Sequence, residues 1–288
     1  MKFINPKTDF AFKRIFGGEQ SKEILMSFLN AILDFKGDKE IKEVEILDPY
    51  QAPKIKGLKD TYLDLKVKTE KGKSIIIEMQ VLNIKGFDKR VLYNLTKSYA
   101  NQIEKGEDYL KLRPVIALTI TDFIMFDNSE KYISNFLFKE KENNSIYNGD
   151  LEMVFLELPK FKKDLKNLKD IQDKWIYFMK EVDNLEVEPK NYKKYKVFEK
   201  AFDLASKINL TKKELDILDK ESMLIQDKRG MIDYALEKGY DEGIEKGMEK
   251  GMEKGMEKGM EKGMEVALNK MIDNGIPEDE AKIILGIR

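Results

Sequence analysis

Two acidic residues near the middle of the chain lie on segments whose alternating pattern is typical of β-strands. Asp64 belongs to TYLDLKVK (61–68) and Glu78 belongs to SIIIEMQV (74–81). In each segment apolar residues recur at every second position, so one face of each strand is expected to lie in the core. The short connection between them contains Gly72, which suits the left-handed position of a tight hairpin loop.

A hairpin centred on the loop pairs Asp64 with Glu78 and Tyr62 with Gln80. Directly opposite residues have Cβ atoms roughly 4.5–5.5 Å apart, so the two carboxylates repel unless a cation lies between them or one is protonated. Converging carboxylate oxygens are what Mg²⁺ or Mn²⁺ requires. Gln80 shares the face of Glu78 and could orient a water or bind a phosphate. A solvated acidic face explains the same residues, and the spacing alone leaves the two interpretations open.

Composition narrows the chemistry further. The 288 residues include no His and no Cys, which argues against zinc sites, histidine-based triads and thiolate nucleophiles. The remaining route to hydrolysis is carboxylate chemistry with a hard cation. No apolar run approaches the roughly 18 residues of a membrane span, and no signal pattern opens the chain, so we expect a cytoplasmic protein without membrane contact. Residues 1–120 carry 22 Lys and Arg against 17 Asp and Glu, which permits DNA binding there.

The elements that would position these residues follow from periodicity. We expect helices over 9–16, 21–33 and 88–102, and two buried strands, RPVIALTITDFIMF (113–126) and LEMVFLEL (151–158). Beyond Pro159 the pattern predicts helices only, around 161–182, 191–208 and 211–227, and a long one from about 230. This organisation predicts a domain over 1–160, a helical region over 161–229 and a repeat region over 230–288.

The repeat region has glycine at every fourth position from Gly239 to Gly263, followed mostly by Met, Glu and Lys. A period of four moves each stripe about 40° around a helix per repeat, and each glycine costs roughly 1 kcal/mol of helix stability relative to Ala. We expect a partly helical segment for homo-oligomerisation or spacing, ending in a Gly-Ile-Pro turn and a short capping helix. A low-complexity linker is the alternative. A membrane helix dimer is rejected because every repeat carries Glu and Lys.

Several motifs in order resemble the Rpn family of recombination-promoting nucleases, also described as transposases, of the PD-(D/E)XK superfamily. They are Asp-Phe-x-Phe-Lys from Asp9, the strand aspartate Asp64, Glu-x-Gln at Glu78, Arg-x-x-Tyr at Arg90, and Lys-Gly-x-x-Tyr from Lys105. The resemblance covers roughly residues 3–160. It implies an α/β (α+β) fold with a mixed central sheet flanked by helices, to which the chain adds an all-helical C-terminal extension.

The resemblance also implies a metal-dependent DNA endonuclease. Asp64 and Glu78 match its metal ligands, so the implied cofactor is Mg²⁺ or Mn²⁺ and the implied substrate is DNA. Gln80 stands where the superfamily usually has lysine, and a neutral amide cannot supply that charge. Lys66, on the same strand face as Asp64, is a hypothetical replacement.

Other positions of the pattern have less definite roles. Asp9 could lie near the metal or could brace its helix. Arg90 and Tyr93 lie one helical turn apart and could contact phosphate or serve the structure. Two rival functions remain: a transposase with an RNase H-like carboxylate triad, which requires a third essential acid, and a non-catalytic DNA-binding or assembly protein on a decayed nuclease core.

Overall fold

The computed structural model describes residues 3–51 and 59–287. The chain divides into two compact units, residues 1–226 and 227–288, which are described separately. The helices between 161 and 209, expected as a separate region, belong to the first unit and share its hydrophobic core.

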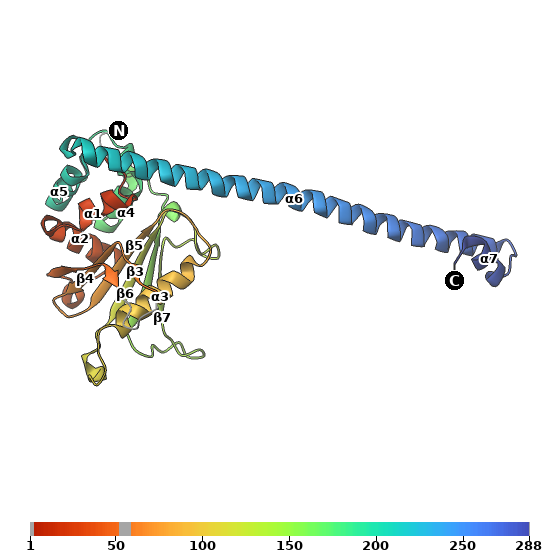
Figure 1. Cartoon of the computed structure of the whole chain (residues 1–288), viewed down its shortest axis with the longest axis horizontal. Helices are drawn as coiled ribbons and strands as arrows, with labels where there is room; N and C mark the ends of the chain where they lie inside the picture. The colour runs from red at the N-terminus through yellow and green to blue at the C-terminus, as the bar shows by residue number, and fades with distance from the viewer. Residues whose placement is uncertain (1–2, 52–58, 288) are drawn as a thin grey trace. The chain divides into compact units, whose positions relative to one another are not determined.

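A six-stranded mixed sheet forms the centre of the first unit, with strand order β1-β4-β5-β6-β8-β7 (Figure 1). The central strands β5, β6 and β8 are parallel, and the outer neighbours β4 and β7 pair antiparallel to them, as does β1 to β4. The helix α3 (Phe87–Ala100) connects β5 to β6 along the chain. A separate two-stranded ribbon joins β2 to β3. The strands are β1 Val44–Leu47, β2 Tyr50–Gln51, β3 Thr61–Tyr62, β4 Leu65–Thr69, β5 Ser74–Gln80, β6 Val115–Thr121, β7 Ile133–Leu137 and β8 Leu151–Glu157.

One face of the sheet packs against four helices, and this contact forms the larger hydrophobic cluster. These helices are α1 (Asp9–Phe16), α2 (Lys22–Ile32), α4 (Ile171–Glu181) and α5 (Lys196–Ala205). Trp175 of α4 is fully buried, and its ring lies 4.2 Å from that of Phe198 and 5.8 Å from that of Phe28, measured between centroids. The aromatic side chains therefore hold these helices together on the sheet.

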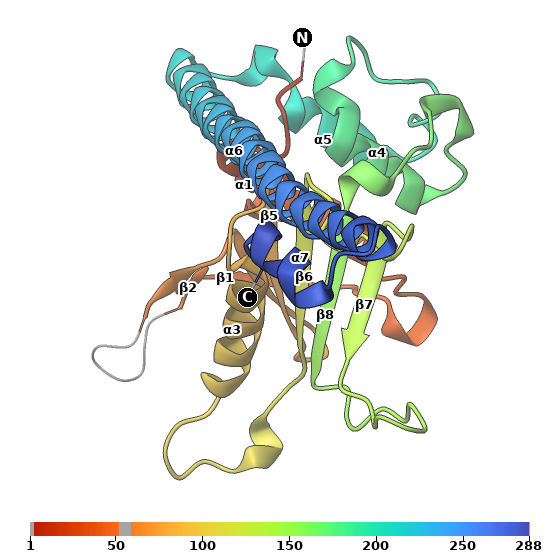
Figure 2. The same cartoon turned by 90° about the vertical axis from the view of Figure 1, so that its right-hand side faces the viewer.

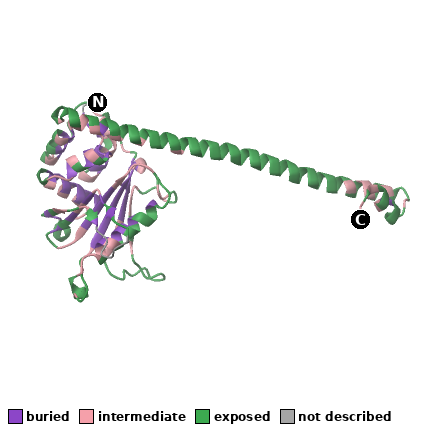
Figure 3. Cartoon of the chain, viewed as in Figure 1, coloured by how far each residue is buried: buried purple, intermediate pink, exposed green. Residues whose placement is uncertain are grey.

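The opposite face packs against α3 (Figure 2). Phe87, Val91 and Leu95 recur at helical spacing and contact Ile76 and Ala117 of the sheet in the second hydrophobic cluster. Because both faces are covered, β6 is buried along its whole length, and β5 and β8 are buried over most of theirs (Figure 3). This burial explains why β6 reads as an unbroken apolar run rather than an alternation.

The predicted hairpin register is confirmed. Leu65 pairs with Ile77 and Lys68 with Ser74 across β4 and β5, and Gly72 in the loop has a φ of 78°. The pairing of Tyr62 with Gln80 is wrong. The expected strand over 61–68 breaks between Tyr62 and Leu65, and Tyr62 pairs instead with Tyr50 of β2.

The break has a packing cause. Leu63 is buried in the cluster beside α3, whereas Leu65 is buried in the cluster on the other face of the sheet. Two residues of the same strand parity would point to the same face of a regular strand. The chain therefore turns over at Asp64, which lies one position beyond the last ladder pair, Leu65 with Ile77.

Other predicted elements are confirmed within one or two residues at their ends, namely α1, α2, α3, β5 and β8. The strand expected over 113–126 is present as β6 but ends five residues earlier, at Thr121. The short strands β1, β2 and β7 were not predicted. Short 3₁₀ turns complete the first unit: Glu19–Ser21, Gly37–Lys39, Tyr109–Lys111, Leu158–Lys160, Leu165–Asn167, Val182–Asn184 and Lys207–Asn209.

The helix α6 (Lys212–Asp273) begins in the first unit and continues through the repeats of the second. At its start, Thr211 and Glu214 form a reciprocal capping box, with the Thr211 N–H donating to Glu214 at 2.7 Å. The two helices expected over 211–227 and from 230 are thus a single helix, because Gly230 lowers helix stability without ending the helix. The predicted turn and final helix are present, with Gly275 at a φ of 86° before α7 (Glu278–Leu285). None of the described helices is long and apolar enough to span a membrane.

Candidate metal and nuclease site

Asp64 occupies the break between β3 and β4, beside the end of β5. Its Oδ2 atom accepts a hydrogen bond of 2.6 Å from the backbone N–H of Met79. Burial raises the pKa of the Asp64 carboxyl to about 6, and the negative charges of Asp9 and Glu78 act in the same direction. The Met79 hydrogen bond and the charge of Lys13 oppose this shift. The charge of Glu78 thus contributes to the raised pKa of Asp64, in line with the predicted proximity of the two carboxylates.

Glu78 lies in β5 and is 8% exposed. The side-chain amide of Asn94, on α3, donates a short hydrogen bond to its Oε1 atom. Its Oε2 atom is buried without a hydrogen-bond partner, and the Nη2 atom of Arg90 lies 3.9 Å from it. Burial raises the pKa of Glu78, and Arg90 and then Asn94 oppose that shift.

Gln80 is held by two hydrogen bonds that fix the orientation of its amide. Its Nε2 atom donates to the carbonyl of Leu82 at 2.8 Å, and its Oε1 atom accepts from Arg90 Nη2 at 2.6 Å. The Arg90 guanidinium also lies 5.1 Å from the centre of the Phe87 ring. Glu78, Gln80 and Arg90, predicted separately, therefore meet at the end of β5.

Asp9 is in the first turn of α1, where it forms an ion pair of 2.8 Å with Lys13. Its side chain is 53% exposed. Its charge reaches Asp64, as the pKa shift of Asp64 indicates. Both interpretations of Asp9 keep support, since it braces α1 through Lys13 and also lies near the acidic pair.

Lys66 and Tyr93 lie apart from the acidic pair. Lys66 lines a cavity of about 400 Å³ with Lys68 and Arg113, beside the loop of the hairpin, and burial lowers its pKa.

 The Tyr93 hydroxyl donates to the carbonyl of Lys59 at 3.2 Å, on the segment that leads into β3. The structure thus does not bring Lys66 or Tyr93 into contact with Glu78 or Gln80.

Asn94 is the site residue that sequence reasoning missed. It is 1% exposed, and its Oδ1 atom is buried without a hydrogen-bond partner. A carboxylate oxygen can only accept, so the Nδ2 atom of Asn94 must face Glu78. This bond fixes the orientation of the Asn94 amide. Asn94 lies four residues after Arg90, on the same helical face, and a polar residue between buried Val91 and Leu95 was the available signal.

The buried oxygens form a set suited to a hard cation. Two carboxylates and one amide converge from β5, α3 and the break before β4, and two of their buried oxygens lack a partner. A buried acceptor without a donor costs roughly 1–3 kcal/mol, so a cation or an ordered water is favoured there. Within residues 3–51 and 59–287, no group of three or more acidic side chains gathers as a metal site.

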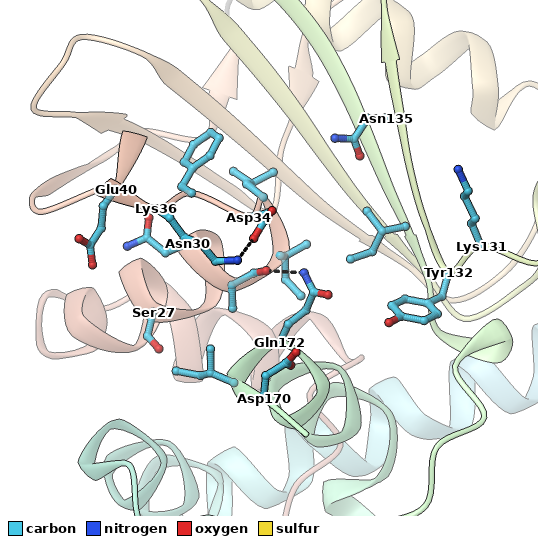
Figure 4. Close-up of a pocket in the computed structure, with 16 residues that line it drawn as sticks. Ser27, Asn30, Asp34, Lys36, Glu40, Lys131, Tyr132, Asn135, Asp170 and Gln172 are labelled. Atoms are coloured by element: carbon cyan, nitrogen blue, oxygen red, sulfur yellow. Dashed lines mark hydrogen bonds and ion pairs between the residues drawn. The ribbon is translucent and has the colours of Figure 1, made fainter. Parts of the chain in front are cut away.

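A second cavity, of about 720 Å³, lies between α2, α4 and β7 (Figure 4). Several of its polar side chains have partners within the cavity: Lys36 forms an ion pair of 2.5 Å with Asp34, and Gln172 donates to the carbonyl of Ala31 at 2.6 Å. None of the residues of the carboxylate site lines it.

The sequence model of a family described as PD-(D/E)XK nuclease family transposase matches residues 6–235. The chain belongs to this family. The matched region includes the whole sheet, the carboxylate site and the beginning of α6, and it confirms the resemblance that the motifs indicated. The PD-(D/E)XK fold, with its mixed sheet between helices, is likewise confirmed. Searches of curated proteins and of solved structures returned no match.

Proposed function

We propose that this member of the PD-(D/E)XK nuclease family is a DNA endonuclease that depends on Mg²⁺ or Mn²⁺. The observation that carries the proposal is the hydrogen bond of 2.6 Å from the Met79 N–H, next to Glu78, to Asp64, together with the buried Oε2 atom of Glu78 that has no hydrogen-bond partner. Family membership supports a nuclease chemistry and a DNA substrate.

The residues present fit a divalent cation. Both carboxylates have raised pKa values because they are buried, so an added positive charge would stabilise their ionised forms. Mg²⁺ and Mn²⁺ prefer oxygen ligands and keep several waters, so two carboxylates suffice on the protein side. The Oδ1 atom of Asn94 is a further oxygen for the ion or for one of its waters.

In the proposed reaction, Asp64 and Glu78 hold the cation. When bound, the cation supplies an acidic water and stabilises charge on the scissile phosphate. The Met79 N–H keeps one oxygen of Asp64 engaged, which fixes the direction of the other. Asn94 fixes Glu78 in the same way from α3. The ligands are therefore preorganised by hydrogen bonds from rigid elements.

A plasmid assay tests the proposal. Supercoiled DNA is incubated with the full chain and with Asp64→Asn and Glu78→Gln, each with Mg²⁺, with Mn²⁺ and with EDTA. We expect cleavage by the wild-type chain only when a metal is present, and a loss on the order of 10²-fold or more in each variant. The exposed residue Asp219 of α6 provides the control Asp219→Asn, which should cleave as the wild type does.

The outcomes separate the candidate functions. Equal cleavage by the wild type and both variants would contradict the assignment of Asp64 and Glu78 to the active site. DNA binding without cleavage under any metal would favour the non-catalytic assembly protein, for which Gln80 in the position of the lysine is the sequence support.

For the second unit we propose homo-oligomerisation through the repeats of α6. Methionines of the repeats are largely exposed on this helix, for example Met248 at 72% and Met252 at 73%. Exposed apolar side chains beside a glycine stripe would be covered by a second helix, with methionine filling the irregular gaps. Light scattering of the full chain tests this: deletion of residues 243–262 should lower the measured mass to that of a smaller assembly, and an unchanged mass would contradict it.

A further inference from the structure

The Glu-x-Gln motif lacks the positive charge that a lysine supplies in the usual superfamily pattern. We propose that Arg90 of α3 supplies this charge and contacts the scissile phosphate, with Gln80 as its positioning residue. The inference rests on the proposed nuclease function and adds a catalytic residue to it.

The first support is the contact between Arg90 and the motif itself. Its Nη2 atom donates a hydrogen bond of 2.6 Å to the Oε1 atom of Gln80 and lies 3.9 Å from the Oε2 atom of Glu78. A lysine at position 80 would place an ammonium on the same strand position, whereas here the glutamine side chain accepts from a cation that reaches in from the helix. The residue that departs from the pattern thus binds a positive charge.

The second support is that the guanidinium is fixed and also accessible. Gln80 is anchored by its own bond to the Leu82 carbonyl, and the Phe87 ring, 2% exposed, lies beneath Arg90. The Arg90 side chain nevertheless remains 41% exposed. A guanidinium has five N–H donors in a planar fork, so a phosphate can be bound with two parallel bonds while the bond to Gln80 is kept.

The third support comes from the alternative cations. Lys66 lines the separate cavity beside the hairpin loop with Lys68 and Arg113. Lys13 is engaged with Asp9 on α1. Among the cationic side chains of residues 3–51 and 59–287, Arg90 is the one with contacts to both Glu78 and Gln80.

The test measures single-turnover cleavage and DNA affinity separately, on a labelled duplex with Mg²⁺. The variants of the full chain are Arg90→Ala, Arg90→Lys, Lys66→Gln and, as a control, Lys89→Ala. Lys89 is an exposed cation next to Arg90 on α3, so its removal changes the net charge equally. Thermal unfolding verifies that each variant is folded.

We expect Arg90→Ala to lower the cleavage rate on the order of 10²–10³-fold, with a change in DNA affinity no larger than that of Lys89→Ala. Added guanidinium ion should restore part of the rate of Arg90→Ala and none of the rate of the Glu78→Gln variant. Arg90→Lys should retain more activity than Arg90→Ala. A merely structural role of Arg90 would not give rescue by guanidinium.

Two results would overturn the inference. One is a cleavage rate of Arg90→Ala equal to that of Lys89→Ala. The other is a large loss in Lys66→Gln with little loss in Arg90→Ala, which would assign the charge to Lys66. If the wild-type chain itself cleaves no DNA with Mg²⁺ or Mn²⁺, both proposals fail, whereas cleavage that survives the loss of Arg90 removes this one alone.

Discussion

Replacement of Asp64 by Asn should stabilise the metal-free protein while it removes the proposed metal ligand. Burial raises the pKa of Asp64 from 3.8 to about 6 in the folded chain. Each unit of pKa shift corresponds to about 1.36 kcal/mol, so ionised Asp64 costs the folded state about 3 kcal/mol at pH 8. Asn carries no charge, and its side-chain oxygen can still accept the hydrogen bond from Met79.

The sign of the pH dependence follows from proton binding. Between pH 3.8 and about 6 the folded state binds more protons at Asp64 than the unfolded state does, so stability from this group falls as the pH rises through that window. The gain in the free energy of unfolding of Asp64→Asn over the wild type should therefore be complete above this pH window. It should be about half as large near pH 5 and absent below the window. Measurement is by urea unfolding in EDTA at pH 5 and pH 8.

Metal binding gives the complementary readout. Mg²⁺ at roughly 100 times its Kd should stabilise the wild type by about 2.7 kcal/mol and leave Asp64→Asn unchanged. The control Asp219→Asn, on the exposed surface of α6, should change stability by less than about 0.5 kcal/mol. Destabilisation by Asp64→Asn at pH 8, or a gain of equal size at both pH values, would refute the electrostatic reasoning.

Three further predictions concern the pH profile, the core and α6. Cleavage at subsaturating Mg²⁺ should decline as the pH falls through about 6, because protonated Asp64 cannot hold the ion, and a flat rate profile from pH 5 to 8 would contradict this. Glu157→Ala should destabilise the fold by about 3–5 kcal/mol in urea unfolding, because it leaves Lys160 buried without its 2.7 Å ion-pair partner; a loss below about 1 kcal/mol would count against it. Gly251→Ala with Gly255→Ala should slow amide exchange within the repeats, since each glycine costs roughly 1 kcal/mol of helix stability, and unchanged exchange would show that α6 is held by other contacts.

Local patterns in the sequence were sufficient to predict the hairpin of β4 and β5 and the elements next to it. Gly72 supplies the left-handed residue of the loop, and the loop length then fixes the register that pairs Leu65 with Ile77. The helical stripe of α3 and the apolar run of β6 were equally clear, because α3 buries residues at helical spacing and every residue of β6 is buried. The short strands β1 and β7 are too brief and too exposed at the sheet edges to give such a signal.

The geometry at Asp64 was decided by tertiary packing. The segment 61–68 reads as one alternating strand, but both faces of the sheet are covered by helices, so alternation cannot tell which face each leucine enters. Leu63 packs toward α3 and Leu65 toward the other helices, and the turnover between them presents Asp64 to the Met79 N–H.

The sequence by itself thus determined the two carboxylates, their neighbouring positions on a hairpin, and the absence of a lysine after Glu78. Only the tertiary structure decided which side chains complete the site. Arg90 and Asn94 reach Gln80 and Glu78 because α3 packs on one face of the sheet, against β6 and β8, next to the end of β5. Contacts between residues on separate elements depend on how the helix packs against the strand, and periodicity within either element does not specify that packing.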